Sequence, residues 1–421
     1  MSRLGGILAI GLLLAGFTAN TALAADQQPF RALLWSDGEG GPLNHALEAG
    51  LEDFTQASGG RYPVSVEWVA PEKSEAWLAE LKAAGTPPDV YMTSAADLKR
   101  HVATGEAYAL DGELAKDRNW QERFPAPLLS LLSVGGKTYA LPITQTVAVV
   151  YYNTEIFRKN GLSAPSTYVD LKKVVQVLNR NGITPIAFGN REGWEGALLS
   201  QLIETRLGGG QLFEKAQGGT GDWMDPSFLA AGRVLAELVR LKAFPKGFDE
   251  MSNDQAVSYF KQGRAGMLVS RDRLFVSLNF SSSAVRNKVA LAPFPTFENG
   301  DSNAWVGSPD FNLVVSEQSK AKEAALEFLK TYSTSELQGH FAGHAFVPVT
   351  GVEIEKNQLV PLLFSLLELQ SNMTRFFLFY NEVLPAGAGR AYEETIRSIL
   401  TGVDPAAAFQ RLQGGWMALG D

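Results

Sequence analysis

Side chains that most often perform covalent catalysis or bind metal ions are scarce in this chain. The sequence has no cysteine and four histidines, at positions 45, 101, 340 and 344. It has no G-x-S-x-G segment to hold a serine nucleophile. His340 and His344 have the spacing at which one helix presents two metal ligands, but Phe341 replaces the glutamate of an H-E-x-x-H site. We therefore expect a protein that is not an enzyme and that needs no cofactor or metal ion.

Carboxylates, by contrast, recur in short polar loops that directly follow predicted strands. These loops are residues 36–41, 93–97, 189–195 and 270–273. Ligands of open α/β sheets bind beyond the carboxyl ends of the strands, so the loops are candidate parts of a binding site. They supply the candidate side chains Asp37, Glu39, Thr93, Ser94, Asp97, Glu192, Arg271 and Asp272.

The elements that must position the first two loops alternate between strand and helix. Hydrophobic periodicity predicts strands at 31–35, 64–68 and 89–92, with helices between them at 43–54 and 77–81. This β-α-β-α-β order predicts a parallel sheet with right-handed crossovers. Trp68 and Trp77 lie in this unit, one in a strand and one on a helix face, so we expect both to pack in the core.

A second α/β series follows and positions the other two loops. It comprises a helix at 171–178, strands at 186–188, 265–269 and 308–315, and a helix at 321–332. Between the two series, residues 147–152 are apolar on both alternating faces, as expected for a central strand covered on both sides. Tyr151 and Tyr152 face opposite ways on such a strand, so they cannot clamp one ferric ion together. The fold class predicted is α/β.

The first residues predict export. Arg3 precedes an apolar block at 7–17, and Ala22-Leu23-Ala24 supplies the small-x-small pattern of a cleavage site. We expect residues 1–24 to be a cleaved signal peptide and the protein to reach the periplasm. Without cysteine, neither a disulfide framework nor a lipid anchor at the cleavage site is expected, which fits an oxidising compartment.

Composition and charge narrow the possible partners. The chain has 421 residues, of which 45% are hydrophobic and 19% charged, and its formal net charge is −8 at pH 7. An acidic chain of this kind disfavours nucleic acid and anionic membranes as partners. The length exceeds that of one typical core, so two lobes are expected.

Four segments together resemble one known family. They are ALPITQTVAVVYYNTEIFRKNGL at 140–162, YFKQGRAGMLVS at 259–270, KAKEAALEFLKTYSTSELQ at 320–338 followed by HAFVPV, and GVDPAAAFQRLQ at 402–413. In this order they resemble the extracellular solute-binding proteins of ABC sugar importers, family 1, of the maltose-binding-protein type. Each segment alone is a weak signal, but the four span nearly all of the chain after the signal peptide.

The resemblance implies a two-lobed periplasmic-binding-protein fold. Each lobe would be a mainly parallel sheet flanked by helices, with the ligand cleft between the lobes. Residues 25–145 plus 300–347 would form the first lobe, and 146–299 plus 348–421 the second. Crossings between the lobes are expected at the strand after Gln145, near 299–304 and near 346–349.

The resemblance also implies where a sugar would bind. Gln145 and Thr146 would lie on the cleft floor beside the hinge. A sugar site needs aromatic rings for the apolar ring face and polar groups for the hydroxyls. Among the eight tryptophans, Trp35, Trp194 and Trp305 are candidates, with Gly307 beside the last, whereas Trp416 would lie in a frayed tail. Family members often have Gly-Asp-Trp where this chain has Arg271-Asp272-Arg273, so the usual stacking tryptophan is missing there.

The resemblance implies a monomeric binding component that delivers a mono- or oligosaccharide to ABC permease membrane subunits. Two alternatives remain open. The first is a binder of an acidic sugar or of a polyol, and Arg271 or Arg273 could meet the carboxylate of an acidic sugar. A periplasmic carbohydrate-active enzyme would need two carboxylates at a fixed separation, and the sequence offers many carboxylates without a way to pair them.

Overall fold

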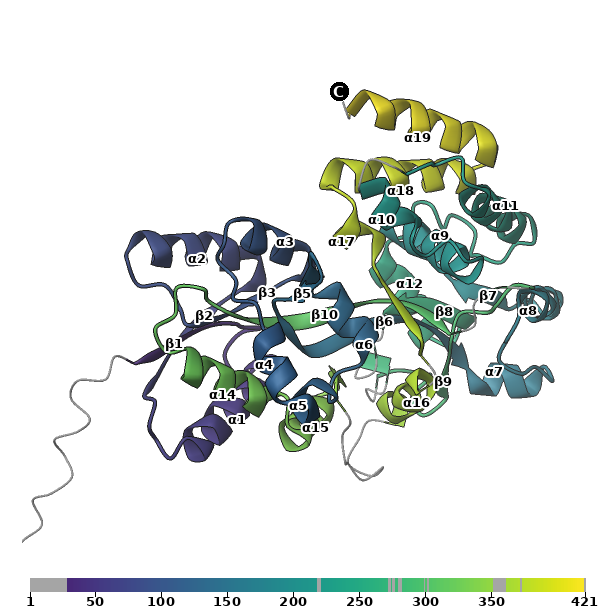
Figure 1. Cartoon of the computed structure of the whole chain (residues 1–421). Coiled ribbons are helices and arrows are strands. Elements are labelled where there is room, and N and C mark those ends of the chain that lie inside the picture. Colours follow the sequence, from purple (N-terminus) through teal and green to yellow (C-terminus); the bar gives the residue numbers. More distant parts are fainter. Residues whose placement is uncertain are drawn as a thin grey trace, which may run out of the picture.

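The computed structural model describes residues 29–217, 221–271, 274, 277–278, 282–298, 300, 303–350, 361–371 and 373–419. The predicted signal peptide at 1–24 and the candidate site residue Asp272 lie outside the described residues. The α/β fold class predicted from the sequence is confirmed. Figure 1 shows two bodies, each with helices on both sides of its strands, joined through the centre by long strands.

The first lobe contains the predicted β-α-β-α-β unit. Its strands are β1 (Phe30–Trp35), β2 (Val64–Val69), β3 (Val90–Thr93) and a small hairpin, β4 (Ser133–Val134) and β5 (Lys137–Thr138). Its helices are α1 (Pro42–Ala57), the short η1 (Pro71–Lys73), α2 (Ser74–Ala83), α3 (Ala95–Ala103), α4 (Asp111–Lys116), α5 (Arg118–Gln121), α6 (Ala126–Leu131), α14 (Lys322–Tyr332) and α15 (Ser335–Gly343). In Figure 1, α2 and α3 lie above the sheet, and α1, α14 and α15 lie below it.

The second lobe is built around the shorter strands β7 (Thr184–Ala187), β8 (Ala265–Arg271), β9 (Val289–Ala292) and β12 (Arg375–Leu378). Its helices are α7 (Thr154–Lys159), α8 (Tyr168–Arg180), α9 (Trp194–Arg206), α10 (Leu212–Gln217), α11 (Pro226–Arg240), α12 (Asn253–Lys261), α16 (Pro361–Gln370), α17 (Tyr380–Val383), α18 (Ala386–Leu400) and α19 (Pro405–Leu419). Helices α9, α11, α18 and α19 pack on one another in one layer, which stands at the upper right of Figure 1.

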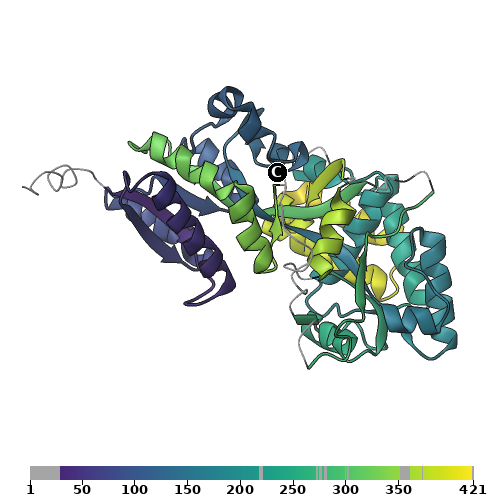
Figure 2. The same cartoon turned by 90° about the horizontal axis from the view of Figure 1, so that it is seen from below.

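Two long strands connect the lobes. Within the described residues the strand order of the main sheet is β2-β1-β3-β10-β6-β8-β7, where β6 is Leu141–Asn153 and β10 is Ala304–Val315. The outer pairs β1–β2, β1–β3 and β7–β8 are parallel, whereas β10 is antiparallel to β3 and β6, and β6 is antiparallel to β8. Figure 2 shows the two bodies side by side, joined through this central pair.

Each long strand changes partners along its length. The first half of β6 pairs with β10 and with β11 (Val347–Pro348), and its second half pairs with β8 and β9. In β10, the residues from Ala304 to Gly307 pair with β12, and those from Asn312 onward pair with β3. Because both strands belong to both lobes, the lobes meet along a shared backbone ladder and not through loops alone.

The strand pair imposes strict local conditions. A Cβ at Gly307 would overlap the carbonyl oxygen of Thr146, so only glycine lets β10 approach β6 this closely. Four residues farther along, Phe311 has a φ of 54°, a left-handed conformation that costs an L-residue roughly 1–2 kcal/mol. Its ring packs edge-on against Trp35 and Phe346, with centroid distances of 6.0 and 5.6 Å, and these contacts help to hold the strained backbone.

Three tryptophans lie elsewhere than the sequence suggested. Trp68 and Trp77 are 36% and 39% exposed, so the expectation that both are core residues is wrong. Within the described residues β2 is the last strand at one edge of the main sheet, a position that alternation along the sequence does not reveal. Trp416 does not lie in a frayed tail. It belongs to α19 and packs edge-on against the buried Trp223 at 5.6 Å.

The end of α15 offers a test of backbone strain. The amide of Phe346 donates to the Phe341 carbonyl oxygen and that of Ala345 to the Ala342 carbonyl oxygen, which is a Schellman end. Ala345 takes the left-handed position at a φ of 63°, where glycine is usual. We predict that Ala345→Gly raises the free energy of unfolding by about 1 kcal/mol, measured by urea denaturation. Ala342→Gly, at a helical position in the last turn of α15, should instead lower it, and equal losses in both variants would contradict the assignment.

Candidate functional site

A cavity of about 470 Å³ opens beside the junction of the two lobes. It is lined by Trp194, Leu198, Arg271, Phe379, Tyr380, Asn381 and Glu393. These residues come from α9, the end of β8, α17 with the residue before it, and α18. Helix α17 also packs near α3 of the first lobe, so the cavity lies at the second-lobe face of the interface between the lobes.

Glycine positions the tryptophan of this cavity. Gly193 adopts a φ of 92°, which turns the chain so that α9 begins at Trp194. Leu198 follows one turn later on the same face. A Cβ at Gly193 would lie 3.4 Å from the Cβ of Glu393, an ordinary contact, so the positive φ and not a lack of space favours glycine here.

The wall of the cavity around Phe379 is held by a glutamine of α9. Gln201 is fully buried; its Nε2 donates to the Leu378 carbonyl oxygen at 2.7 Å, and its Oε1 accepts from the Tyr380 amide at 3.0 Å. The two bonds fix the backbone on both sides of Phe379. The Arg271 guanidinium then lies 3.9 Å from the centre of the Phe379 ring, a cation–π arrangement.

Glu393 lines the cavity, and two further acids, Glu192 and Glu195, flank Trp194 in the chain. The Tyr380 hydroxyl donates to Glu393 Oε1 at 2.6 Å, and burial together with this carboxylate raises the pKa of Tyr380. Burial raises the pKa of Glu195 to about 8, and the nearby carboxyls of Glu192 and Glu393 add to the rise. For Glu192 burial acts in the same direction, but the Asn253 amide and the Arg191 guanidinium prevail and lower its pKa.

A further carboxyl joins α17 to the connecting strand β10. Ser308 Oγ donates to Glu382 Oε2 at 2.6 Å. Burial raises the pKa of Glu382 to about 7, against the opposing effects of the Ser308 hydrogen bond and the Arg271 charge. This contact couples the cavity wall to the strand that runs into the first lobe.

The structure brings some predicted site residues together at this cavity. Trp194 and Arg271 line it, and Glu192 lies at the start of α9, where it pairs with Arg191 at 2.8 Å. The predicted residues of the first lobe end β1 and β3 or follow them, at the carboxyl ends of the strands. Asp97 is tied to its own helix, because the Ser94 hydroxyl donates to its carboxylate at 2.6 Å.

Other predicted residues are engaged in holding the fold. Asp37 accepts hydrogen bonds from the amides of Leu43 and Asn44. Its carboxylate therefore caps the start of α1, and both of its oxygens are already engaged. Glu39 is exposed in the same loop. Trp35 and Thr93 are buried at the ends of β1 and β3, and Trp35 Nε1 and Thr93 Oγ1 have no hydrogen-bond partner among the described residues.

The predicted hinge residues are buried in the strand pair. Gln145 Nε2 donates to the Pro348 carbonyl oxygen at 2.9 Å, and its Oε1 accepts from Gln370 at 3.3 Å. Thr146 pairs with Ser308 in the ladder, and Trp305 and Gly307 lie in β10, with Trp305 only 4% exposed. These side chains fix how the strands cross, and none of them lines the cavity.

The sequence analysis missed the residues contributed by α17 and α18. They are Phe379, Tyr380, Asn381 and Glu393. The only sequence signal was the aromatic run RFFLFYNE at 375–382, which has no periodicity that separates a binding wall from a core strand. Leu198, one turn after Trp194, also lines the cavity and was not predicted.

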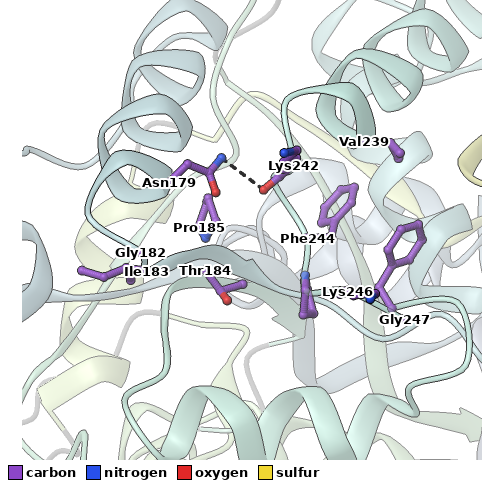
Figure 3. Close-up of a pocket in the computed structure, with 12 residues that line it drawn as sticks. Asn179, Gly182, Ile183, Thr184, Pro185, Val239, Lys242, Phe244, Lys246 and Gly247 are labelled. Carbon is purple, nitrogen blue, oxygen red and sulfur yellow. Dashed lines mark hydrogen bonds between the residues drawn. The ribbon is translucent and has the colours of Figure 1, made fainter.

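A larger hollow, of about 650 Å³, lies at the far edge of the second lobe (Figure 3). It is formed between β7, the end of α8 and the loop after α11, where Asn179 Nδ2 donates to the Lys242 carbonyl oxygen at 3.2 Å. Its wall is mainly aliphatic and aromatic, and its lysines are exposed. It contains none of the predicted site residues, whereas the smaller cavity near the junction of the lobes contains Trp194 and Arg271.

Two searches of the described residues found nothing. No group of three or more histidine, cysteine, aspartate or glutamate side chains is arranged to hold a metal ion within that part of the chain. None of its helices combines the length and the apolar character needed to cross a membrane.

Comparison with known proteins identifies similar chains. Residues 41–339 match the family model described as bacterial extracellular solute-binding protein. An uncharacterized ABC transporter extracellular-binding protein of Pyrococcus horikoshii is 27% identical over 200 residues, 46% of this chain and 44% of that protein. The multiple sugar-binding protein of Streptococcus mutans is 26% identical over 241 residues, 54% of this chain and 56% of that protein. The chain thus matches about half the length of these curated relatives.

A solved structure extends the likeness to nearly the whole fold. The family 1 extracellular solute-binding protein from Bifidobacterium longum subsp. infantis superposes with a TM-score of 0.76 at 18% identity. The match covers 93% of this chain and all of that chain. At this identity the likeness establishes the two-lobed fold alone.

The buried carboxyls make stability depend on pH. Glu204 of α9 is fully buried, accepts hydrogen bonds at 2.8 Å from both Ser200 and Tyr392, and has its pKa raised to about 8 by burial. The folded chain therefore keeps a proton that the unfolded chain releases above its ordinary pKa of 4.5. This group's contribution to stability is present in full below that pH and is lost as the pH rises to about 8.

We predict that Glu204→Gln flattens the fall of the unfolding free energy between pH 5 and pH 8. A group of this kind changes the slope by up to about 1.4 kcal/mol per pH unit. Urea denaturation at four pH values measures the slope. Glu214→Gln, at an exposed position of α10, serves as the control, and a Glu204→Gln slope equal to that of the control would refute the assignment.

Proposed function

Since the chain belongs to the bacterial extracellular solute-binding proteins, we propose that it is the substrate-binding component of an ABC importer for a mono- or oligosaccharide. It captures the sugar between its lobes and delivers it to the membrane permease. The observation that carries the proposal is the cavity at the lobe junction, in which Trp194 faces charged and hydroxyl-bearing side chains. The sugar-binding name of the Streptococcus mutans relative supports the same ligand class.

The chemistry of the cavity suits a sugar. An indole ring stacks on the apolar face of a pyranose, and planar polar groups hold the hydroxyls at its edge. Trp194 supplies the ring, whereas Asn381, Glu393 and Tyr380 supply acceptors and donors. Hydrogen bonds from hydroxyls to a carboxylate are roughly twice as strong as neutral ones, which favours Glu393 as an anchor.

Hinge closure is the proposed motion. We take residues 25–145 plus 300–347 as one rigid body and 146–299 plus 348–421 as the other. The shared ladder of β6 and β10 supports this division, because a small change of twist in two strands rotates everything attached to their ends. A ligand that touches both lobes favours the closed form by its difference in affinity for the two states.

The proposal also includes export of the chain to the periplasm. A cleaved signal peptide at 1–24 delivers the chain to the periplasm, where it meets its sugar and the permease as a monomer. No reaction is assigned to this chain, and ATP is hydrolysed by other subunits of the importer.

The first test concerns Trp194. We predict that Trp194→Ala weakens binding of the sugar identified in a thermal-shift screen by at least about 1 kcal/mol, because stacking and buried area are lost. The screen is sensitive enough, since a ligand at 100 times its Kd adds about 2.7 kcal/mol of stability. Without ligand, the variant should lose less than the roughly 3–5 kcal/mol typical of a deleted core tryptophan. Trp77→Ala, on the exposed face of α2, should bind as the parent does. Normal binding by Trp194→Ala with a large loss of stability would remove Trp194 from the site.

The second test concerns motion. We predict that saturating sugar lowers the radius of gyration measured by small-angle X-ray scattering, because the ligand bridges the lobes. Trp194→Ala at the same sugar concentration should compact less, in proportion to its lower occupancy. Identical scattering of the free and saturated parent protein would exclude closure as the response to binding.

A further inference from the structure

Two exposed tryptophans lie at the outer edge of the first lobe. Trp68 of β2 and Trp77 of α2 are two of the three strongly exposed large apolar side chains among the described residues, and the third, Val169, lies on α8 of the second lobe. Within the described residues β2 is the last strand on this side of the main sheet. Exposed aromatic rings beside an open sheet edge are typical of a surface that binds another chain.

The backbone of β2 directs its unused hydrogen-bonding groups outward. The Val69 carbonyl oxygen accepts from the Ser36 amide, just after β1, at 2.9 Å, so Val69 points toward β1. The direction of the amides and carbonyls alternates along a strand paired in this way. Val64, Val66 and Trp68 therefore direct their amides and carbonyl oxygens to the open edge, where no other described strand pairs with them.

Strand β2 lacks the features that usually protect a sheet edge. It has six residues, all in register with β1, and it contains no proline and a single charged residue, Glu67. Natural edge strands are commonly short or bulged, or they contain lysine or proline, because an open edge otherwise pairs with other chains. The length and composition of β2 therefore suit the addition of a further strand.

Trp68 lies on the face of the sheet that α1 covers. In the register of β1 and β2, Phe30 pairs with Val64 and Leu34 pairs with Trp68. The Phe30 ring packs against Phe54 of α1 at a centroid distance of 5.4 Å. Residues an even number of positions apart share one face of a strand, and paired residues share a face of the sheet. The Trp68 side chain is therefore on the side of α1, which lies below the sheet in Figure 1.

Trp77 belongs to the helix on the other face. On one side of α2, Glu75 contacts His101 of α3 at 3.1 Å, and Lys82 pairs with Glu106, just after α3, at 2.8 Å. Helix α3 packs near β10, so this side of α2 is turned toward the centre of the sheet. Trp77 follows Glu75 by two residues, about 200° around the helix, and so lies on the side turned toward β2. One indole ring thus flanks the open edge on each face.

The charge around this edge is negative. The exposed charged residues of β2, of η1 and of the outward side of α2 are Glu67, Glu72, Lys73 and Glu80. Arg61, at the start of the strand, is already paired with Glu327 of α14 at 3.1 Å. A second copy of this chain would bring the same carboxylates together, and the chain has a formal net charge of −8. A positively charged partner is therefore favoured over self-association.

We propose that the edge of β2 is a docking site for an extended, positively charged segment of a partner protein. The segment adds a strand beside β2, and its side chains lie against Trp68 on one face and Trp77 on the other. Its lysine or arginine side chains meet the carboxylates and the indole rings. This site goes beyond sugar capture, because β2 is at the end of the sheet away from β6 and β10, and docking there leaves the cavity and the hinge free.

Fluorescence anisotropy with dye-labelled peptides tests the proposal on the purified protein. The probes are a short peptide in which valine alternates with lysine, the same peptide with glutamate in place of lysine, and the lysine peptide with N-methylated backbone amides. N-methylation removes the donors of the added strand and keeps its charge and side chains. We expect the lysine peptide to bind at least tenfold more tightly than either of the other two.

Variants of the chain locate the binding. Val66→Pro removes an outward amide and no bond to β1, so it should weaken binding of the lysine peptide at least tenfold and keep the sugar binding of the parent. Ser65→Pro removes an amide that points toward β1, so it should instead lower the melting temperature. Trp68→Ala and Trp77→Ala should each weaken peptide binding at least threefold, whereas Val169→Ala, on the second lobe, should leave it unchanged.

The results decide between the possible occupants of the edge. Absence of binding by the lysine peptide, equal binding by the glutamate or the N-methylated peptide, or binding that survives Val66→Pro overturns the proposal. If Val66→Pro does not fold, unchanged peptide binding by Trp77→Ala overturns it. Dimers of the chain alone in sedimentation velocity that Val66→Pro abolishes would make a second copy the occupant and overturn it too. The sugar-binding test of Trp194→Ala is independent of these results, so the proposed function is judged separately.

Discussion

The antiparallel contact between β6 and β10 is the constraint on which the rest of the structure depends. The two strands can lie this close only because Gly307 has no side chain to strike the Thr146 carbonyl oxygen. Their pairing places the end of β3 on one side and β8 with β12 on the other. Both the first-lobe loops and the second-lobe cavity therefore take their places from one ladder, and a change in its twist would move them relative to each other.

A strained backbone residue and a buried carboxyl lie along this ladder. Phe311 keeps a left-handed backbone in the middle of β10, and Glu382 holds its carboxyl against Ser308 a few residues away. A core without a strained backbone or a buried carboxyl would cost less free energy to fold. They persist beside a cavity and at a junction between lobes, which is where stored strain most often serves a function.

The sequence predicted the fold well because its signals are local. The apolar run of β1 and the helical spacing of α1 depend on residues a few positions apart, and the start of each element was predicted within one residue. Trp194 and Arg271 followed from the rule that ligands bind at strand exits. The place of Phe379 could not be predicted in this way. It depends on Gln201, 178 residues earlier in the chain, which hydrogen-bonds to the backbone on either side of Phe379. The prediction that Trp68 is a core residue was wrong for the same reason, because distant segments decide whether a strand is central or at the edge of the sheet.

Helix α9 shows how one element serves both stability and binding. Its length is buried on nearly every side, so its acids at 195 and 204 must each be satisfied or remain protonated. Glu204 Oε1 accepts hydrogen bonds from two hydroxyls within the second lobe, whereas its Oε2 is buried and has no partner among the described residues. Glu195, nine residues earlier and next to Trp194, meets none among the described residues. Both acids thus keep a carboxyl oxygen without a donor among the described residues, and burial raises the pKa of each to about 8. Trp194 and Leu198 near the amino end of α9 line the cavity, so the proposed ligand site lies at that end, and the buried remainder of the helix supports the core of the second lobe.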